Sequence, residues 1–326
     1  MKIATTGTGN IVALFIEAAN ANHDVECVSV FSRNALRAKA FANECGIAHS
    51  TDDWDELLAS TDTDFIYIAT PNSLHFQQAK QALQRGKNVI CEKPFTSTRS
   101  ELLELIGIAK SKNLFLFEAI STIHMPNFLK IFELLPDVGR IKLLNCSYSQ
   151  FSSKYNSFLD QQNPNVFNPQ FSGGALMDIN IYNLHFIHRL FGTPIQVNYL
   201  ANIADNGIDT SGIVTLRYAD FVATCIGTKD SNGINYAQIQ GEKGYLNVSQ
   251  GANGCQSIYL NCNGVEKTIN IQNQNNRLFY EIETFKHIYS QRDYKSCYAL
   301  LEHSLQVMDT VEKARKSAGI YFPADS

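Results

Sequence analysis

The strongest constraint on the fold is the regular alternation of strand-like and helical segments over the first 118 residues. Apolar runs with the composition of strands occupy five segments, namely Lys2–Thr6, Val25–Phe31, Phe65–Thr70, Lys87–Cys91 and Leu114–Phe117. Helical patterns lie between them, at Ile11–Ala21, Ala35–Cys45, Leu74–Gln84 and Ser100–Ser111. The last of these is preceded by Thr98-Arg99-Ser100-Glu101, which has the spacing of a capping box. Such alternation is typical of a parallel sheet with helices packed on its faces. We therefore predict an α/β domain over residues 1–118.

The first predicted strand runs directly into a glycine turn, Gly7-Thr8-Gly9-Asn10-Ile11, which opens a helix. Two glycines let the backbone turn tightly and approach a pyrophosphate, which the N–H groups at the start of the helix then face. The third position of this fingerprint holds Val12 in place of Gly or Ala, so a plain strand-to-helix turn is the alternative interpretation. We predict that Gly7, Gly9, Asn10 and Ile11 bind a dinucleotide.

The end of the second strand indicates which dinucleotide binds. A carboxylate at this place binds a free ribose 2′-hydroxyl, whereas arginine accommodates a 2′-phosphate. Here the strand continues into Ser32 and Arg33 without an acid, and Arg37 follows four residues later. The two arginines could meet on one side of the first helical turn, or both could be ordinary surface residues. We predict NADP as the cofactor, with NAD as the alternative.

Two further loops follow predicted strands and therefore lie at the edge of the sheet where open α/β folds bind ligands. The first is Thr70-Pro71-Asn72-Ser73-Leu74-His75, in which Ser73 is a natural helix N-cap and Asn72 and His75 could face the cofactor. The second is Cys91-Glu92-Lys93-Pro94, in which proline restricts the backbone of Lys93. Glu-Lys-Pro is also a common surface turn, so its position after a strand is what makes Lys93 a candidate.

Another candidate element is the predicted helix 175–191, which follows Gly173-Gly174. At 3.6 residues per turn, one stripe of this helix carries polar side chains: Asp178, Tyr182, His185 and Arg189. A polar stripe can simply face water, but an Asp-Tyr-His row is an unusual choice for that purpose. The paired glycines would let a ligand approach the start of the helix. No Gly-x-Ser-x-Gly motif supports a hydrolase.

The remaining sequence predicts a second domain over residues 119–326. Alternating β-like runs dominate residues 195–271 and are separated by short turns, which favours a mostly antiparallel sheet. Two helices, 277–291 and 296–317, close the chain.

Composition excludes several classes of function. The net charge of −4 and the absence of a Lys/Arg cluster argue against nucleic-acid binding. No apolar run approaches the ~20 residues of a membrane helix. The eight cysteines are scattered without a Cys-x-x-Cys pair, so we expect neither a disulfide framework nor a metal site. Cys27, Cys91, Cys146 and Cys225 lie in apolar runs and are predicted core residues. We expect a cytoplasmic protein.

Taken together, these motifs resemble the family of glucose–fructose oxidoreductase, inositol dehydrogenase and MocA proteins. The resemblance covers nearly the whole chain. It rests on the glycine fingerprint, the loops at 70–75 and 92–94, and the segment Gly173-Gly174-Ala175-Leu176-Met177-Asp178 with Tyr182. Glu118-Ala119 and Tyr182 are similar to the dihydrodiol and xylose dehydrogenase branch, although His124 stands where many of those relatives have Arg.

The resemblance implies a fold and a reaction. The fold is an N-terminal Rossmann domain plus a C-terminal α+β domain with an open, mostly antiparallel sheet, through which a homodimer or homotetramer often forms. The reaction is hydride transfer between nicotinamide and a hydroxyl or carbonyl of a sugar, cyclic polyol or dihydrodiol. Lys93 would stabilise the developing alkoxide, Tyr182 would carry the proton, and Asp178 would orient or charge the pair. His124 and His185 are further candidates for substrate contact.

Two alternatives stay open at this stage. One is an aldose–aldose oxidoreductase that never releases its cofactor; that relative carries an extra N-terminal arm, whereas this chain starts at the first strand. The other is a non-enzymatic dinucleotide-binding redox sensor, which would have no need to keep Lys93, Asp178 and Tyr182.

Overall fold

A computed structural model describes all residues, 1–326, and the chain forms two compact units. Unit 1 comprises Met1–Ala119 and Asn276–Leu305, and unit 2 comprises Ile120–Asn275 and Gln306–Ser326. The predicted division placed all of residues 119–326 in one domain, whereas segment 276–305 packs with the N-terminal unit. Each unit is therefore built from two separate stretches of chain.

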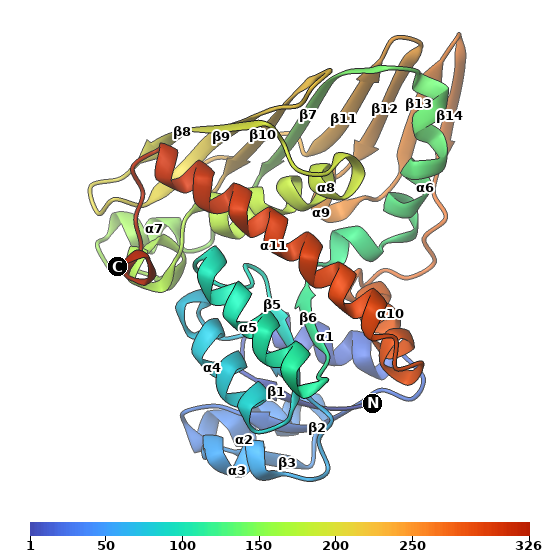
Figure 1. The fold of residues 1–326 in the computed structure, drawn as a ribbon. Helices are drawn as coiled ribbons and strands as arrows, with labels where there is room; N and C mark the ends of the chain where they lie inside the picture. Colours follow the sequence, from blue (N-terminus) through green and yellow to red (C-terminus); the bar gives the residue numbers. More distant parts are fainter. The chain divides into compact units, whose positions relative to one another are not determined.

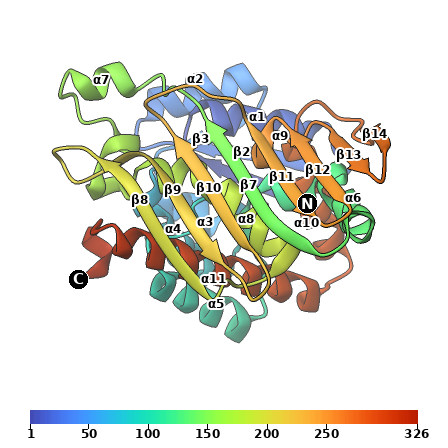
Figure 2. The same cartoon turned by 90° about the horizontal axis from the view of Figure 1, so that it is seen from above.

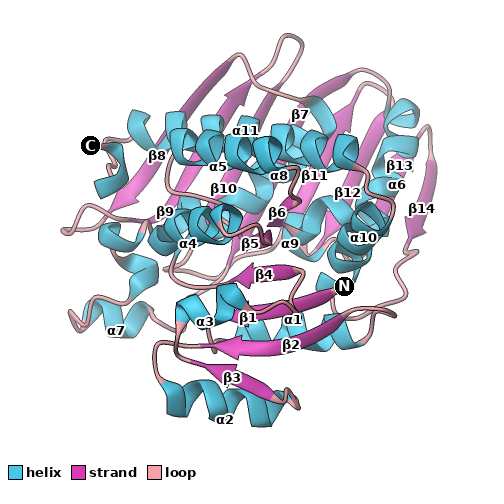
Figure 3. Ribbon diagram, turned by 60° about the horizontal axis from the view of Figure 1, so that its bottom comes forward, coloured by secondary structure: helices cyan, strands magenta, loops and turns pink.

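Unit 1 is built around a six-stranded sheet in the order β3-β2-β1-β4-β5-β6, in which every neighbouring pair is parallel. Its strands are β1 Lys2–Thr6, β2 Glu26–Phe31, β3 His49–Thr51, β4 Phe65–Ile68, β5 Asn88–Glu92 and β6 Leu116–Ala119. Figure 3 shows β3, β2, β1 and β4 side by side. The predicted parallel α/β sheet is confirmed. The sequence pattern missed β3, whose three residues are too few to show a periodicity.

The helices of unit 1 are α1 Asn10–Asn20, α2 Ala35–Cys45, α3 Trp54–Ala59, α4 Asn72–Gln84, α5 Arg99–Lys112 and α10 Leu278–Ser290, together with the first part of α11 Tyr294–Ser317. In the core, the ring of Phe15 on α1 stacks on Tyr67 of β4, with ring centroids 3.7 Å apart. Phe285 of α10 stacks on Phe117 of β6 at 4.4 Å. These aromatic contacts explain why segment 276–305 belongs to this unit, because they bury large apolar side chains of α10 against the sheet.

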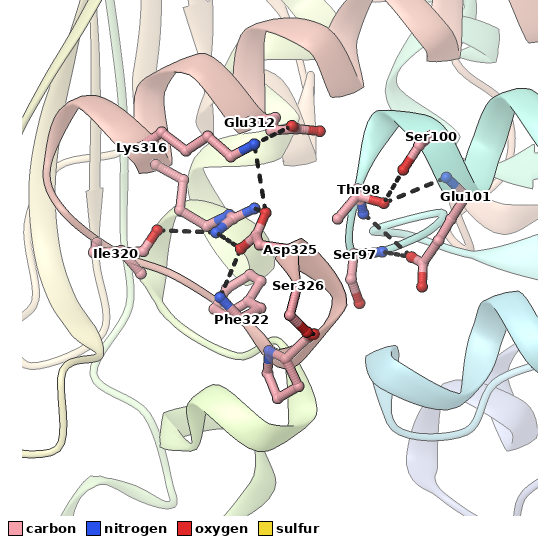
Figure 4. Close-up of polar contacts among 12 residues, drawn as sticks. Ser97, Thr98, Ser100, Glu101, Glu312, Lys316, Ile320, Phe322, Asp325 and Ser326 are labelled. Carbon is pink, nitrogen blue, oxygen red and sulfur yellow. Dashed lines mark hydrogen bonds and ion pairs between the residues drawn. The ribbon is translucent and has the colours of Figure 1, made fainter.

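Helix α5 begins with the capping box that its sequence predicts. The Thr98 hydroxyl accepts a hydrogen bond from the Glu101 N–H, and the Glu101 carboxylate accepts one in return from the Thr98 N–H (Figure 4). The same carboxylate accepts a further bond from the Ser97 N–H at 2.9 Å. This cap therefore anchors the end of the loop that begins at Lys93.

Unit 2 contains an eight-stranded sheet in the order β14-β13-β12-β11-β7-β10-β9-β8. Its strands are β7 Ile141–Ser149, β8 Gln196–Ile203, β9 Asp209–Arg217, β10 Val222–Thr228, β11 Tyr236–Gly241, β12 Gly244–Ser249, β13 Ile258–Cys262 and β14 Val265–Ile269. Only β7 and β10 pair in parallel, so the predicted mostly antiparallel sheet is confirmed. Within this unit, α8 and α9 cover one face of the sheet, and Figure 2 looks onto the other face.

The helices of unit 2 are α6 Pro126–Leu134, α7 Tyr155–Leu159, α8 Ile181–Phe191, α9 Gly251–Gly254 and the last part of α11. Short 3₁₀ turns are η1 Ser121–His124, η2 Leu135–Val138, η3 Asn165–Phe167, η4 Pro169–Phe171 and η6 Pro323–Asp325, and η5 Leu176–Asn180 is a π-helical turn. Near the end of α11, the buried Arg315 guanidinium forms two bonds with the Asp325 carboxylate of η6 (Figure 4).

None of the helices is both long enough and apolar enough to cross a membrane. All eight cysteines are free thiols. Cys27, Cys91, Cys146 and Cys225 are buried, as predicted for core residues. Burial is the largest cause that raises the pKa of each of these four thiols, so they lie in apolar surroundings.

Candidate active site

The carboxyl ends of the unit 1 strands carry the loops that the sequence singled out. The strand order reverses between β1 and β4, and ligands of open α/β sheets bind beside such a reversal. Gly7 follows β1 with a φ of +96°, and a Cβ at this position would lie 2.8 Å from the carbonyl oxygen of Ala69 after β4. The position therefore requires glycine, both for its backbone conformation and for the close approach of the two loops.

Val12 explains the departure from the glycine fingerprint. Helix α1 begins at Asn10, and the Val12 side chain on its first turn is completely buried in the core of unit 1. It therefore supplies the close helix–sheet packing that a third glycine or alanine provides elsewhere. The N-cap residue Gly9 makes no side-chain cap, so the first N–H groups of α1 are available to an anion.

The end of β2 fits a phosphate-bearing cofactor. Phe31 is followed by Ser32, Arg33 and the N-cap residue Asn34, whose side chain accepts a hydrogen bond from the Arg37 N–H. Both arginines are exposed, and neither guanidinium forms an ion pair within the protein. No carboxylate follows the strand, so two cations and a hydroxyl lie where the cofactor ribose of a Rossmann fold is held.

His75 joins the two loops that were predicted to face the cofactor. It lies on the first turn of α4 and is 1% exposed. Its Nδ1 is 2.9 Å from the carbonyl oxygen of Pro94, and its Nε2 is 2.9 Å from that of Thr70. Burial lowers its pKa, while the two carbonyls act in the opposite direction. Helix α4 begins at Asn72 with Pro71 as N-cap, so the predicted N-cap role of Ser73 is wrong.

The Glu92 side chain is buried and hydrogen-bonded within unit 1. It is 7% exposed, and its Oε1 accepts a hydrogen bond of 2.6 Å from the Tyr67 hydroxyl. Its Oε2 accepts a bond from the Lys93 N–H at 3.3 Å. Burial is the main cause that raises the Glu92 pKa, against the opposing effects of Tyr67 and Lys93. The result is a fixed loop that presents the half-buried Lys93 at the carboxyl end of β5.

The second group of predicted residues lies in unit 2, on a helix that differs from the predicted one. Residues 176–180 form a π-helical turn, and only Ile181–Phe191 is α-helical. The predicted stripe does not face solvent as a whole, because Tyr182 is 6% and His185 0% exposed, whereas Asp178 is partly exposed and Arg189 is exposed. π-Helical turns within helices occur frequently at functional sites. The Tyr182 ring packs edge-on against Tyr148, with centroids 5.8 Å apart.

The two glycines before this turn have a different role from the predicted one. A Cβ on Gly173 would lie 2.6 Å from the carbonyl oxygen of Val166, and one on Gly174 would lie 2.0 Å from the Asp209 carboxylate. The space around them is filled by the protein itself. Asp209 accepts hydrogen bonds of 2.7 Å from the Leu176 N–H and from the Tyr199 hydroxyl. The glycines therefore let a buried carboxylate cap the turn that carries Asp178.

Two buried histidines of unit 2, His124 on η1 and His188 on α8, are uncharged. His124 of η1 is 8% exposed, and burial, with a smaller contribution from Arg189, lowers its pKa to about 3. Burial likewise lowers the pKa of His188 to about 3, and neither ring nitrogen of His188 has a hydrogen-bond partner. Both imidazoles are therefore neutral at physiological pH. The predicted substrate contacts through His124 and His185 remain predictions.

Sequence reasoning missed one residue next to the predicted site, Lys229. It lies directly after β10, is 5% exposed, and its ammonium forms an ion pair with the Asp178 carboxylate. The available signal was a lysine at the end of an otherwise uncharged strand, Val222–Thr228. That signal was insufficient because nothing in the sequence places β10 beside residue 178.

Comparisons with known proteins decide the family. A model described as "Oxidoreductase family, NAD-binding Rossmann fold" matches residues 1–119, and one for the GFO/IDH/MocA C-terminal domain matches residues 136–247. The chain belongs to the GFO/IDH/MocA family. This confirms the family that the motifs resemble, and the chain is an NAD(P)-dependent oxidoreductase.

Several GFO/IDH/MocA members match over nearly their full length. The scyllo-inositol 2-dehydrogenase (NADP(+)) IolU of Bacillus subtilis is 35% identical over 100% of this chain and 99% of its own. An uncharacterized oxidoreductase of Escherichia coli, YgjR, is also 35% identical, over the same shares. The trans-1,2-dihydrobenzene-1,2-diol dehydrogenase of Danio rerio is 27% identical over 92% of this chain and 91% of its own.

Solved GFO/IDH/MocA structures share the fold. KijD10, a 3-ketoreductase from Actinomadura kijaniata in complex with NADP and TDP-benzene, matches with a TM-score of 0.87 at 21% identity, over 97% of both chains. A levoglucosan dehydrogenase in complex with NADH and levoglucosan matches with a TM-score of 0.83 at 19% identity, over 98% of this chain and 97% of its own.

Proposed function

We propose that this chain is an NADP-preferring dehydrogenase that acts on a secondary hydroxyl of a cyclic polyol or sugar. The observation that carries the proposal is the end of β2, where Arg33 and Arg37 are exposed without ion-pair partners and no acid is present. The relative IolU, 35% identical over the whole chain, is named for scyllo-inositol and NADP. Its name supports a cyclic polyol as the first substrate class to test.

The residues that would hold the cofactor follow from the geometry of unit 1. Gly7, Gly9, Asn10 and Ile11 form the turn and the helix start that suit a pyrophosphate. Ser32, Arg33 and Arg37 would bind the 2′-phosphate. The remaining contacts would come from the two loops that His75 joins, through Thr70, Pro71, Asn72, Glu92 and Lys93.

The chemistry divides between the cofactor and the protein. When bound, nicotinamide accepts the hydride that leaves the substrate carbon. Lys93 would donate a hydrogen bond to the substrate oxygen and stabilise the negative charge that develops there. Tyr182 would take the hydroxyl proton, and Asp178 would orient it. His124 would offer a neutral imidazole to a substrate hydroxyl, because its pKa is about 3.

The test is cofactor reduction with a panel of substrates. The purified protein would be mixed with NADP or NAD and with inositol isomers, aldoses or a dihydrodiol, and reduction would be followed by nicotinamide absorbance. We expect turnover with at least one cyclic polyol and a preference for NADP of about ten- to a hundredfold. Turnover with NAD at equal or higher kcat/KM would contradict the cofactor assignment, and turnover with the dihydrodiol alone would contradict the polyol and sugar class.

We also propose a homodimer or homotetramer formed through the uncovered face of the unit 2 sheet, and a cytoplasmic location. Leu200, Ile213 and Ile226 lie in register on three neighbouring strands, and Leu200 and Ile213 are 66% and 40% exposed. An exposed row of branched apolar side chains is typical of an interaction surface. Eight free cysteines fit a reducing compartment.

A further inference from the structure

Two hydrogen bonds fix the backbone of Lys229. Its N–H donates to the Thr210 carbonyl at 2.9 Å, and its own carbonyl accepts from the Ser152 N–H at 2.8 Å. The side chain is 6% exposed, and the ammonium lies 5.7 Å from the centroid of the Phe167 ring. A lysine is rarely buried to this extent unless its charge is compensated. The ammonium therefore needs a partner inside unit 2.

Asp178 is that partner, and the other two carboxylates nearby accept hydrogen bonds from other groups. Asp209, on β9, accepts bonds from the Leu176 N–H and the Tyr199 hydroxyl. Asp230, next to Lys229, accepts bonds of 2.7 and 2.9 Å from the hydroxyls of Thr210 and Ser211. The ammonium of Lys229 forms its ion pair with Asp178, whose side chain is 30% exposed.

The π-helical turn and β10 are locked together, which fixes the geometry of this pair. Asn180, on the turn, donates to the Cys225 carbonyl at 2.8 Å, and Asn183 donates to the Ile226 carbonyl at 3.0 Å. Gly227 lets the two elements approach, because a Cβ there would lie 2.6 Å from the Cβ of Asn180. Lys229 follows directly on this strand. The ion pair thus joins two elements whose mutual position is already set.

We propose that Lys229 is a positioning residue that holds the Asp178 carboxylate in place for its part in catalysis. The proposal rests on the proposed function, which gives Asp178 its role beside Tyr182. The two charges depend on each other, because removal of either takes away the oppositely charged partner of a partly buried ion. The pair also cancels the charge of Asp178, so the carboxylate acts as an oriented acceptor more than as a net negative charge.

The main test is the pH dependence of the variant Lys229→Met. Lys229→Met removes a positive charge that favours the ionised form of the neighbouring carboxyl, so we expect the activity to depend on pH differently from that of the wild type. We expect kcat to fall about 10- to 100-fold at neutral pH and to recover partly as the pH is raised. KM should change little if substrate binding does not use the pair. Lys229→Arg keeps the cation and should restore most of the activity.

Two controls separate positioning from a general loss of structure. Lys142→Met removes a lysine that pairs with Glu242 on the surface of the same unit, at 2.7 Å, and should leave kcat and its pH profile unchanged. In the background of Asp178→Asn, Lys229→Met should cost little further activity, because the two residues act as one unit. Wild-type kcat and pH profile in Lys229→Met, or fully additive losses in the double variant, would overturn the proposal.

Thermal unfolding needs no substrate, so it tests the Lys229–Asp178 pair independently of the proposed function. Thermal unfolding of the wild type, Lys229→Met, Asp178→Asn and the double variant gives the coupling between the two side chains. We expect the double variant to be more stable than the sum of the single losses predicts. If the substrate panel yields no turnover while the coupling is present, the proposed function fails and the ion pair stands. Absence of coupling overturns the inference whatever the substrate.

Discussion

Lys93 carries the most specific prediction at the level of single residues. Its backbone is fixed by the bond from its N–H to Glu92 and by Pro94, whose carbonyl oxygen lies beside the ring of His75. These contacts lie within the protein itself, so in the proposed mechanism Lys93 would act by electrostatics without a costly rearrangement. Arg33 and Arg37 differ from it, since they are exposed and make no ion pair.

Lys93→Met should abolish most turnover while it leaves the fold and cofactor affinity nearly unchanged. Loss of one such electrostatic group costs about 10²–10³-fold in kcat. The measurement is kcat with the substrate found in the panel, together with the NADP dissociation constant and the melting temperature. A kcat within a few-fold of the wild type would remove Lys93 from the mechanism.

Replacement of Arg33 and Arg37 together by Ala should weaken NADP binding about ten- to a hundredfold and NAD binding little, because charge-assisted bonds to a phosphate are lost. The dissociation constants of NADP and NAD, measured for the wild type and the double variant, test this prediction. Arg85→Ala is the matched control, since Arg85 is an exposed arginine of the same unit that pairs with Asp55. Equal weakening of both cofactors would show that the arginines do not read the 2′-phosphate.

Glu281 gives a prediction about stability and pH. It is 0% exposed on α10, and neither carboxyl oxygen has a hydrogen-bond partner. Burial, followed by the charge of Glu92, raises its pKa well above the usual range, against the opposing effect of Arg277. The folded protein thus binds this proton more tightly than the unfolded chain. The resulting stability is present below the unfolded pKa of about 4.3 and is lost as the pH rises through the folded pKa.

Glu281→Gln should therefore be more stable than the wild type in alkaline solution, by about 1–3 kcal/mol, and differ little from it in acid. Melting temperatures of both proteins across the pH range measure this directly. Glu283→Gln, an exposed position on the same helix, is the control and should show no such trend. An advantage of Glu281→Gln that is the same at every pH would argue against a titrating carboxyl.

At the level of elements, helix ends hold the candidate site in place. The capping box of α5 anchors the loop after Lys93, and Asp209 caps the π-helical turn that carries Asp178. Both devices use a side-chain oxygen to satisfy N–H groups that a helix start leaves unpaired. The geometry of each catalytic candidate depends on a residue that takes no part in the chemistry.

Thr98→Ala should lower the free energy of unfolding by about 1 kcal/mol, because the hydroxyl no longer accepts the Glu101 N–H. Thr98→Ser keeps that oxygen and should be close to the wild type. Denaturant unfolding curves of the three proteins test the prediction. Equal stability of the alanine and serine variants would mean that the cap contributes nothing measurable.

At the level of the whole molecule, we propose that the uncovered sheet face of unit 2 forms the interface between subunits. Ile213 lies between Leu200 and Ile226 in the register of three strands, so a charge there would face any partner sheet. Burial of a charge without a partner is costly, so a carboxylate at this position would oppose such an interface.

Ile213→Glu should convert the proposed oligomer to monomers, as measured by light scattering after gel filtration at several concentrations. Val265→Glu is the control, because Val265 is 62% exposed on β14 and lies away from this row. A wild type that is monomeric at every concentration, or an Ile213→Glu variant that keeps the wild-type mass, would place the interface elsewhere or remove it.

The sequence alone determined the features that are local or periodic. The strand–helix alternation, the glycine turn at Gly7 and the capping box at Thr98 each depend on residues close together in the chain, so their patterns are readable without a fold. The family also follows from such motifs, in their order along the chain.

Only the tertiary structure showed which residues far apart in sequence contact one another. The sequence could not show that α10 packs on β6, that Asp209 occupies the space beside Gly174, or that Lys229 pairs with Asp178. Each of these contacts joins residues far apart in sequence, and burial then changes what a charged or small side chain does. The helix predicted for residues 175–191 begins instead with a π-helical turn, in which the Asn180 side chain and the Leu176 N–H are bonded to β10 and Asp209, both distant in sequence.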